Sequence, residues 1–171
     1  MKKTVLVVDD DNAVRESMSK VLREAGYGVV LAAGGLEALL RFNLDPIDVL
    51  LLDLKLPNQN GWDVFEHLTR IKPWIPVILI TGLPNQYPTA LAAGASALFE
   101  KPIDVNELLT SMERLLAEPK ELRLKRLCGH LADTRFGPPA EVADLGRSPK
   151  FAGLRSAERC SLPDSSPEPR P

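Results

Sequence analysis

The sequence predicts an α/β fold in which a parallel β-sheet is covered by helices on both faces. Between residues 4 and 117, five short apolar runs alternate with segments that repeat apolar residues at helical spacing. Alternating strands and helices favour a parallel sheet, because each helix carries the chain back to the start of the next strand. The runs are rich in Val, Ile and Leu without polar interruption, as expected for strands buried on both faces.

The first strand is predicted at residues 5–8, directly before the acidic triplet Asp9-Asp10-Asp11. Apolar residues then recur at helical spacing over residues 14–25, and Asp11 or Asn12 is suited to cap the start of this helix. Gly26 is a typical stop signal after the last apolar position. The first strand and the first helix are therefore joined by a carboxylate-rich turn.

The middle of the chain repeats this pattern. Residues 29–31 form the second predicted strand, and Leu36, Leu39 and Leu40 mark the second helix. The third strand is predicted at residues 49–52, which again end at an aspartate. These elements extend the alternation that indicates a parallel sheet.

The later elements are less uniform. The third helix is predicted at residues 64–71, and residues 77–80 form the fourth strand. The fourth helix is weaker because Pro84 and Pro88 interrupt its segment. A short fifth strand follows at residues 98–99.

The last helix of the repeating pattern covers residues 108–116, and Asp104 and Glu107 before it have the spacing of a capping box. The composition changes at Glu118, and 8 of the 15 prolines lie after residue 117. We therefore expect a domain at residues 1–118 and a C-terminal extension at residues 119–171. In the extension we expect a short amphipathic helix at about 119–132 and then a disordered tail.

Polar side chains follow the carboxyl ends of four predicted strands. Asp9 and Asp10 follow the first strand, and Asp53 ends the third. Thr81 follows the fourth strand, and Lys101 lies just beyond the fifth. Because these ends meet at one edge of a parallel sheet, we expect the five side chains to converge.

Clustered carboxylates with a hydroxyl and an ammonium group indicate a site for a cation and a phosphoryl group. Carboxylate oxygens are hard ligands that suit Mg²⁺ or Mn²⁺. The metal, Lys101 and the Thr81 hydroxyl could then share the oxygens of a phosphoryl group. A carboxylate among these groups can attack phosphorus and form an acyl phosphate. Asp53 is the best candidate, because it is the lone acid at the end of its strand.

Four segments of the sequence carry a family resemblance: "VLVVDDDNAVRE", "DVLLLDLKLPNQNGWDV", "VILITG" and "FEKPID". In this order and spacing they resemble the CheY-like receiver domain of bacterial two-component response regulators. The resemblance covers roughly residues 3–118. It implies a flavodoxin-like, doubly wound, five-stranded parallel sheet with strand order 2-1-3-4-5.

The resemblance also implies a role for each site residue. Asp53 would be the phosphorylated residue and a metal ligand. Asp10 would bind the metal directly, and Asp9 would bind it largely through water. Lys55 would supply its backbone carbonyl as a further ligand, and Thr81 would bond a phosphoryl oxygen.

The remaining implied roles lie around the fifth strand. Lys101 would pair with a phosphoryl oxygen, and the peptide bond to Pro102 is expected to be cis. The family usually has an aromatic switch residue three positions before this lysine, where this chain has Leu98. Gly82 stands where the family often has alanine, which would leave the phosphoryl site open.

The leading functional hypothesis is a stand-alone receiver that takes a phosphoryl group from a histidine kinase or phosphotransfer protein and signals through protein contacts. Such a protein assists its own phosphorylation and dephosphorylation but is not an enzyme in the usual sense. A haloacid-dehalogenase-like aspartyl-phosphate hydrolase is an alternative, because Asp9, Asp11, Thr81 and Lys101 imitate its motifs. That alternative leaves Asp53 idle. A pseudo-receiver that only binds partners is a third hypothesis, kept open by Leu98.

Composition restricts the other partners. The net charge of −2 gives no electrostatic case for nucleic-acid binding. The apolar run after "MKK" is too short for a signal peptide or a membrane span, so we expect a cytoplasmic protein without a membrane contact. In that compartment Cys128 and Cys160 are expected to be free thiols, and His130 to be a surface residue and not a metal ligand.

Overall fold

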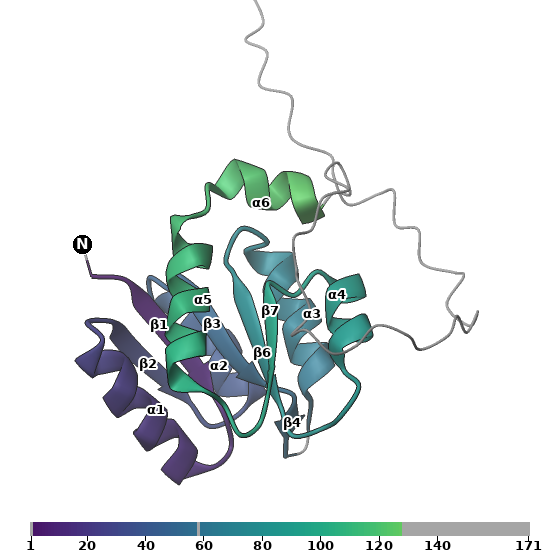
Figure 1. Cartoon of the computed structure of the whole chain (residues 1–171). Helices are drawn as coiled ribbons and strands as arrows, with labels where there is room; N and C mark the ends of the chain where they lie inside the picture. The colour runs from purple at the N-terminus through teal and green to yellow at the C-terminus, as the bar shows by residue number, and fades with distance from the viewer. Residues whose placement is uncertain (1, 58, 128–171) are drawn as a thin grey trace, which may run out of the picture. The chain divides into compact units, whose positions relative to one another are not determined.

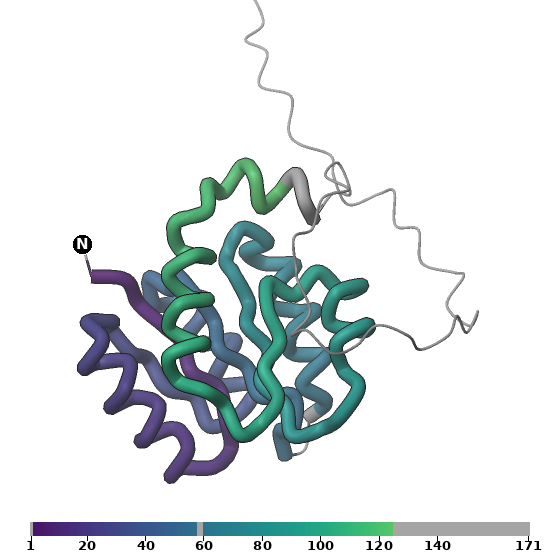
Figure 2. The backbone as a smooth tube through the Cα atoms, viewed as in Figure 1, coloured from purple at the N-terminus to yellow at the C-terminus, as the bar shows by residue number. Residues whose placement is uncertain are grey.

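The computed structural model of this chain describes residues 2–57 and 59–127 (Figures 1 and 2). Within these residues five parallel strands form one sheet. The strands are β1 (Thr4–Val8), β2 (Gly28–Ala32), β3 (Val49–Asp53), β6 (Val77–Thr81) and β7 (Ala97–Glu100). Their spatial order is β2-β1-β3-β6-β7, which is 2-1-3-4-5 when only the strands of this sheet are counted. The predicted fold class and strand order are confirmed.

Helices alternate with the strands along the chain. They are α1 (Asn12–Glu24), α2 (Gly35–Leu44), α3 (Gly61–Ile71), α4 (Tyr87–Ala93), α5 (Val105–Ala117) and α6 (Lys120–Leu127). Figure 1 shows α1 and α5 in front of the sheet and α2 and α3 behind it. The sheet therefore has helices on both faces, as the alternating pattern predicts.

The apolar runs of the sequence form the centre of the molecule. Every residue of β3 and β6 is buried, and so are the four C-terminal residues of β1. Strands covered on both faces cannot alternate between apolar and polar residues, which explains the continuous runs. Because they are buried on both faces, β1, β3 and β6 hold the side chains at their carboxyl ends in fixed positions.

Predicted start and stop signals operate at the helix ends. Asp11 caps α1 by accepting hydrogen bonds from the backbone N–H groups of Ala13 and Val14. Asp104 caps α5 in the same way. Gly26 follows α1 with φ of +93°, a conformation that favours glycine. The predicted helix caps at Asp11 and Asp104 and the predicted stop at Gly26 are therefore present in the structure.

The second helix is present as predicted, but its orientation differs from the leucine pattern. Leu36 and Leu40 are exposed, and the buried face of α2 consists of Gly35, Ala38 and Phe42. The helix has two apolar sides, and the side that carries the aromatic ring packs on the sheet. Apolar spacing alone does not distinguish the two sides.

A small antiparallel hairpin after β3 was not predicted. It consists of β4 (Lys55–Leu56) and β5 (Gln59–Asn60). Gly61 follows it, and a Cβ atom at Gly61 would lie 2.5 Å from both the Cα and the carbonyl oxygen of Leu54. Glycine is therefore required where the start of α3 crosses the end of β3.

The predicted C-terminal helix begins at Lys120, and the structure describes it to Leu127. Its predicted continuation at 128–132, the expected disordered tail, both cysteines and His130 lie outside the described residues. The first compact unit of the chain runs from Met1 to Leu124. Among the residues described, no helix is both long enough and apolar enough to cross a membrane.

Within this first unit Arg123 of α6 is buried against α5 and the start of β7. Its guanidinium group donates hydrogen bonds to the Ser96 hydroxyl at 3.0 Å and to the Leu115 carbonyl at 2.8 Å. It also lies 3.1 Å from a carboxylate oxygen of Glu118. Burial lowers the pKa of Arg123 to about 10, so the group is charged at neutral pH and depends on these partners.

Candidate functional site

The polar residues predicted to converge lie at one edge of the sheet. Asp9 follows β1, Asp53 ends β3 and Thr81 ends β6. Lys101 follows β7, whose last residue is paired with Thr81 in the parallel register. Because the strands are parallel and adjacent, their carboxyl ends deliver these side chains to one edge.

Lys101 joins two of the carboxylates directly. Its Nζ atom lies 2.9 Å from Oδ2 of Asp9 and 2.6 Å from Oδ2 of Asp53. Asp9 and Asp53 are only 4% and 3% exposed, so each has lost most of its contact with water. The ammonium group offsets the repulsion that two such buried carboxylates would otherwise exert on each other.

Backbone N–H groups fix the second oxygen of each of these carboxylates. Oδ1 of Asp9 accepts a hydrogen bond of 2.9 Å from the N–H of Asp11. Oδ1 of Asp53 accepts one of 2.8 Å from the N–H of Lys55. Each carboxylate is thus held between a backbone donor and Lys101, which orients both groups before any ligand arrives.

Asp10 is exposed and adds a third carboxylate to the group; we call Asp9, Asp10, Asp53, Thr81 and Lys101 together the acidic pocket. One oxygen atom from each of Asp9, Asp10 and Asp53 lies within 4.8 Å of the others. Three carboxylates thus face the single ammonium of Lys101, so acidic groups outnumber basic ones at this site. An all-oxygen donor set with this excess of acidic groups fits a hard divalent cation. The side chain of Lys55 is exposed, and its carbonyl remains a predicted further ligand.

Thr81 is fully buried and its hydroxyl oxygen is held in place. Oγ1 accepts a hydrogen bond of 2.9 Å from the N–H of Leu83. A hydroxyl that accepts a bond retains its own hydrogen to donate. The carbonyl of Thr81 accepts a bond of 2.8 Å from the N–H of Lys101, so the two residues are tied together through the backbone.

Burial and the contacts between the paired groups both shift their pKa values. Burial raises the pKa of Asp53, and Asp9 adds to this rise, although hydrogen bonds from Lys101 and Lys55 act against it. Burial alone would lower the pKa of Lys101, but its hydrogen bonds with Asp53 and Asp9 outweigh burial and raise it. Both shifts favour the protonated groups, whereas a bound cation would favour the ionised carboxylates.

Two further expectations concern the segment around β7. The Lys101–Pro102 peptide bond is cis, as the resemblance implied. Leu98 lies in β7, is half-buried and packs against the central apolar cluster. Whether Leu98 acts as a switch stays a prediction.

Sequence reasoning did not find Arg15. Its guanidinium group donates a 2.7 Å hydrogen bond to the carbonyl of Asp9 and a 3.0 Å bond to the side chain of Asn12. It therefore braces the turn that carries the acidic residues. A basic residue in the first turns of a helix that begins at an acidic loop was the available signal.

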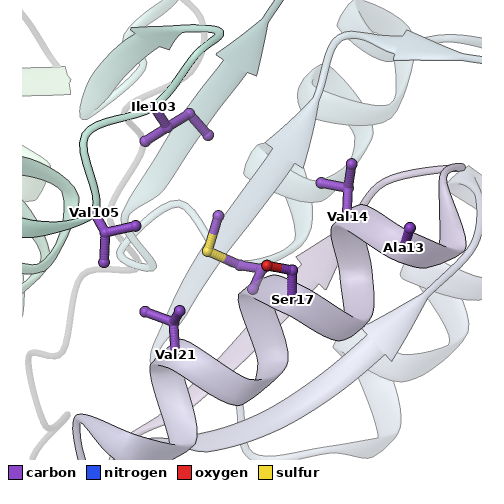
Figure 3. Close-up of a pocket in the computed structure, with 7 residues that line it drawn as sticks. Ala13, Val14, Ser17, Val21, Ile103 and Val105 are labelled. Atoms are coloured by element: carbon purple, nitrogen blue, oxygen red, sulfur yellow. The ribbon is translucent and has the colours of Figure 1, made fainter.

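An apolar groove of about 370 Å³ lies along α1, beside the loop between β7 and α5 (Figure 3). Its lining includes Ala13, Val14, Ser17, Val21, Ile103 and Val105. Ala13 and Val14 belong to the first turn after the acidic triplet, and Ile103 is two residues beyond Lys101. The groove is therefore lined by residues that lie close in sequence to the acidic triplet and to Lys101.

Comparison with known proteins gives one family. The sequence model of the response regulator receiver domain family matches residues 5–113 of this chain. The response regulator MprA of Mycobacterium bovis is 38% identical over 150 residues, which is 86% of this chain and 65% of the relative. The DNA-binding transcriptional regulator NtrC of a Bradyrhizobium strain is 31% identical over 149 residues, 85% of this chain and 29% of the relative. The chain thus spans less than two thirds of either relative.

Solved structures of response regulator proteins resemble this chain. A CheY-like receiver domain protein from Methanospirillum hungatei has a TM-score of 0.65 and 30% identity, with 74% of this chain and 99% of that chain covered. The response regulator TrrA of Thermotoga maritima, solved in complex with Mg²⁺ and BeF, has a TM-score of 0.62 and 29% identity. That match covers 66% of this chain and 98% of TrrA.

Proposed function

This chain belongs to the response regulator receiver domain family, and from that premise we propose that it accepts a phosphoryl group on Asp53 from a histidine kinase or phosphotransfer protein. Receiver domains are signalling modules of two-component systems and not classical enzymes. One observation carries the assignment of Asp53: it is the carboxylate at the end of the central strand β3, and it lies nearer to Lys101 (2.6 Å) than Asp9 does (2.9 Å). Asp9 is otherwise held in the same way, by a backbone N–H and Lys101.

The chemistry follows from these contacts. An ionised oxygen of Asp53 attacks the phosphorus atom of a phosphohistidine, and the P–N bond breaks as the P–O bond forms. The bonding electron pair returns to the imidazole ring, which takes up a proton, and Asp53 becomes an acyl phosphate. Lys101 then pairs with a phosphoryl oxygen, and the Thr81 hydroxyl donates a hydrogen bond to another.

Asp9, Asp10, Asp53 and the Lys55 carbonyl would hold Mg²⁺ in this proposal. The close approach of three carboxylate oxygens and the structure of TrrA with Mg²⁺ support it. When bound, the ion supplies positive charge to the phosphoryl oxygens and to the surrounding carboxylates. The protein's own part is to orient the acids and to keep Lys101 charged.

We place the docking site of the phosphodonor on the groove of α1. The groove is apolar, and three of its lining residues, Ala13, Val14 and Ile103, follow Asp11 and Lys101 closely in the sequence. A donor that presents a phosphohistidine on a helix could seat its apolar face there and reach Asp53. A small donor such as acetyl phosphate needs no such contact, which allows docking and chemistry to be tested separately.

The output of the domain is proposed to act through protein contacts. Leu98 occupies the switch position, and a leucine can transmit a movement of Thr81 only by packing, because it has no polar atom. A pseudo-receiver that never accepts a phosphoryl group would share this fold and this leucine. The oriented Asp53–Lys101 pair favours the phosphoacceptor.

Labelling with acetyl phosphate tests the proposal. With Mg²⁺ the intact mass of the chain should rise by one phosphoryl group, and EDTA should prevent this. Asp53→Asn should remain unlabelled, whereas Asp63→Asn, which changes an exposed acid on α3, should label like the wild type. Equal labelling of wild type and Asp53→Asn would refute the assignment, and no labelling of the wild type would favour the pseudo-receiver.

A further inference from the structure

The solvent side of α2 carries three exposed leucines. Leu36 is 75% exposed, Leu40 57% and Leu44 72%. They are spaced four residues apart and form a ridge along the helix, opposite the buried Ala38 and Phe42. We name these three side chains the leucine ridge. The fold does not need it for packing, since the other side of α2 contacts the sheet.

Two opposite charges flank the ridge on one side. Nε of Arg41 lies 3.8 Å from Oε1 of Glu37, and both side chains are almost half exposed. Glu37 also accepts a hydrogen bond of 2.9 Å from the backbone N–H of Ala33, which fixes its position at the start of the helix. The acid therefore lies nearer the N-terminus of α2 and the base one turn nearer its C-terminus.

We propose that the leucine ridge binds α2 of a second copy of this chain in an antiparallel, two-fold symmetric pair. Such a rotation keeps each flank on its own side and reverses the helix direction. Glu37 of one copy then faces Arg41 of the other, and the reverse contact forms at the same time. A parallel pair would instead place both charges against the uncharged flank with Leu39 and Asn43.

Helix packing rules allow this contact. Residues at i, i+4 and i+8 form one of the natural ridges of an α-helix, and two such ridges interlock at a crossing angle of about −50°. Leu40 would lie near the two-fold axis, with Leu36 of each copy beside Leu44 of the other. The apolar ridge supplies the attraction and the flanking charges select the antiparallel orientation.

The small area of the leucine ridge determines the affinity that we expect for the dimer. Stable complexes bury about 800 Å² on each partner, and three leucines with a short charged flank supply less. We therefore expect a weak dimer that is populated only at high protein concentration. Since α2 contributes no residue to the acidic pocket, Asp53→Asn should associate like the wild type. The failure of this proposal is thereby separate from any failure of the proposed function.

Sedimentation velocity of the full chain over a concentration series is the test. The weight-average mass should rise from 18.8 kDa towards twice that value as the concentration approaches about 1 mM. Leu40→Glu should keep the chain monomeric, because it places a charge at the centre of the contact. Leu122→Glu, a matched change at an exposed leucine of α6, should leave the association unchanged.

The charge pairing has its own variants. Arg41→Glu should weaken the association by about tenfold or more, since it sets acid against acid across the axis, and Arg41→Ala should weaken it less. A wild-type chain that stays monomeric throughout would overturn the proposal, whatever else covers the ridge. A dimer that survives Leu40→Glu would also overturn it, because the contact would then lie elsewhere. Equal effects of the two Arg41 variants would overturn the antiparallel arrangement.

Discussion

At the scale of single residues, the pocket concentrates negative charge where water is scarce. Asp9 and Asp53 are nearly fully buried, and Asp10 stands beside them. One lysine cannot neutralise three carboxylates, and burial, with a smaller contribution from Asp9, raises the pKa of Asp53. The arrangement costs stability while the site holds no cation, and it creates the affinity for one.

The stability of the chain should therefore depend on Mg²⁺ through Asp10. At a tenfold excess of free ion over its dissociation constant, binding to the native state adds about 1.4 kcal/mol to the free energy of unfolding. Asp10→Asn should lose most of this gain, measured as the shift in melting temperature between Mg²⁺ and EDTA. Asp63→Asn is the control, and an unchanged Mg²⁺ response in Asp10→Asn would contradict the assigned ligand.

The convergence of most candidate site residues could be predicted from the sequence, because in a parallel sheet the residues that follow the strands share an edge. This reasoning needs no side-chain detail, and it was sufficient to predict that Asp53, Thr81 and Lys101 lie at one edge of the sheet. It could not find Arg15, whose contact with the Asp9 carbonyl depends on how far a long side chain reaches back over its own helix. Nor could it give the roles of Lys55 or Leu98, which rest on the family resemblance.

At the scale of elements, predictions succeeded where local chemistry decides the structure. Helix starts at Asp11 and Asp104 were readable because a side-chain oxygen satisfies N–H groups that the helix leaves unpaired. The face of α2 that is buried could not be predicted from the sequence. Leucines at 36 and 40 satisfy helical spacing, yet the ring of Phe42 fills the space beneath the helix. The spacing of apolar residues identifies a helix, but packing against the sheet determines which face of the helix is buried.

The groove on α1 should matter for a protein donor only. Val14→Glu places a charge in the apolar lining of the groove without altering a carboxylate. We expect labelling by acetyl phosphate to stay within twofold of the wild type and transfer from a phosphorylated histidine donor to fall at least tenfold. Arg114→Glu on the exposed side of α5 is the control. Parallel losses with both donors would mean that Val14 supports the pocket itself.

The first residues of α6 should contribute to the stability of the domain. Arg123→Ala removes the hydrogen bonds to Ser96 and Leu115 and the ion pair with Glu118, which should lower the free energy of unfolding by about 2–4 kcal/mol. Urea unfolding measures this, with the exposed Arg114→Ala expected to change it by less than about 0.5 kcal/mol. Equal stabilities of the two variants would show that Arg123 does not anchor α6.

At the scale of the whole molecule, the two proposed contacts use different faces of the sheet. The groove belongs to α1 and the start of α5, which lie in front of the sheet in Figure 1, and the leucine ridge belongs to α2 behind it. A dimer through α2 would leave both acidic pockets open to a donor. The two proposals therefore use different helices of the domain.

The strand order could be predicted only through the family resemblance, whereas the fold class followed from the residues. Alternating apolar runs and helical spacing indicate a parallel sheet but do not say which strand lies at its centre. Here β3 and β6 are buried at every position, and the more exposed β2 and β7 form the edges. Strand burial depends on contacts distant in sequence, which a local pattern does not contain.

Chemical trapping of the modified residue tests the central claim most directly. The chain would be labelled with acetyl phosphate and Mg²⁺ and reduced at once with borohydride, which converts an aspartyl phosphate into homoserine. Peptide mass spectrometry should then find homoserine at position 53 and unchanged aspartate at positions 9 and 10. Homoserine at position 9, which the hydrolase alternative requires, or a phosphoryl group on any other side chain would contradict the account.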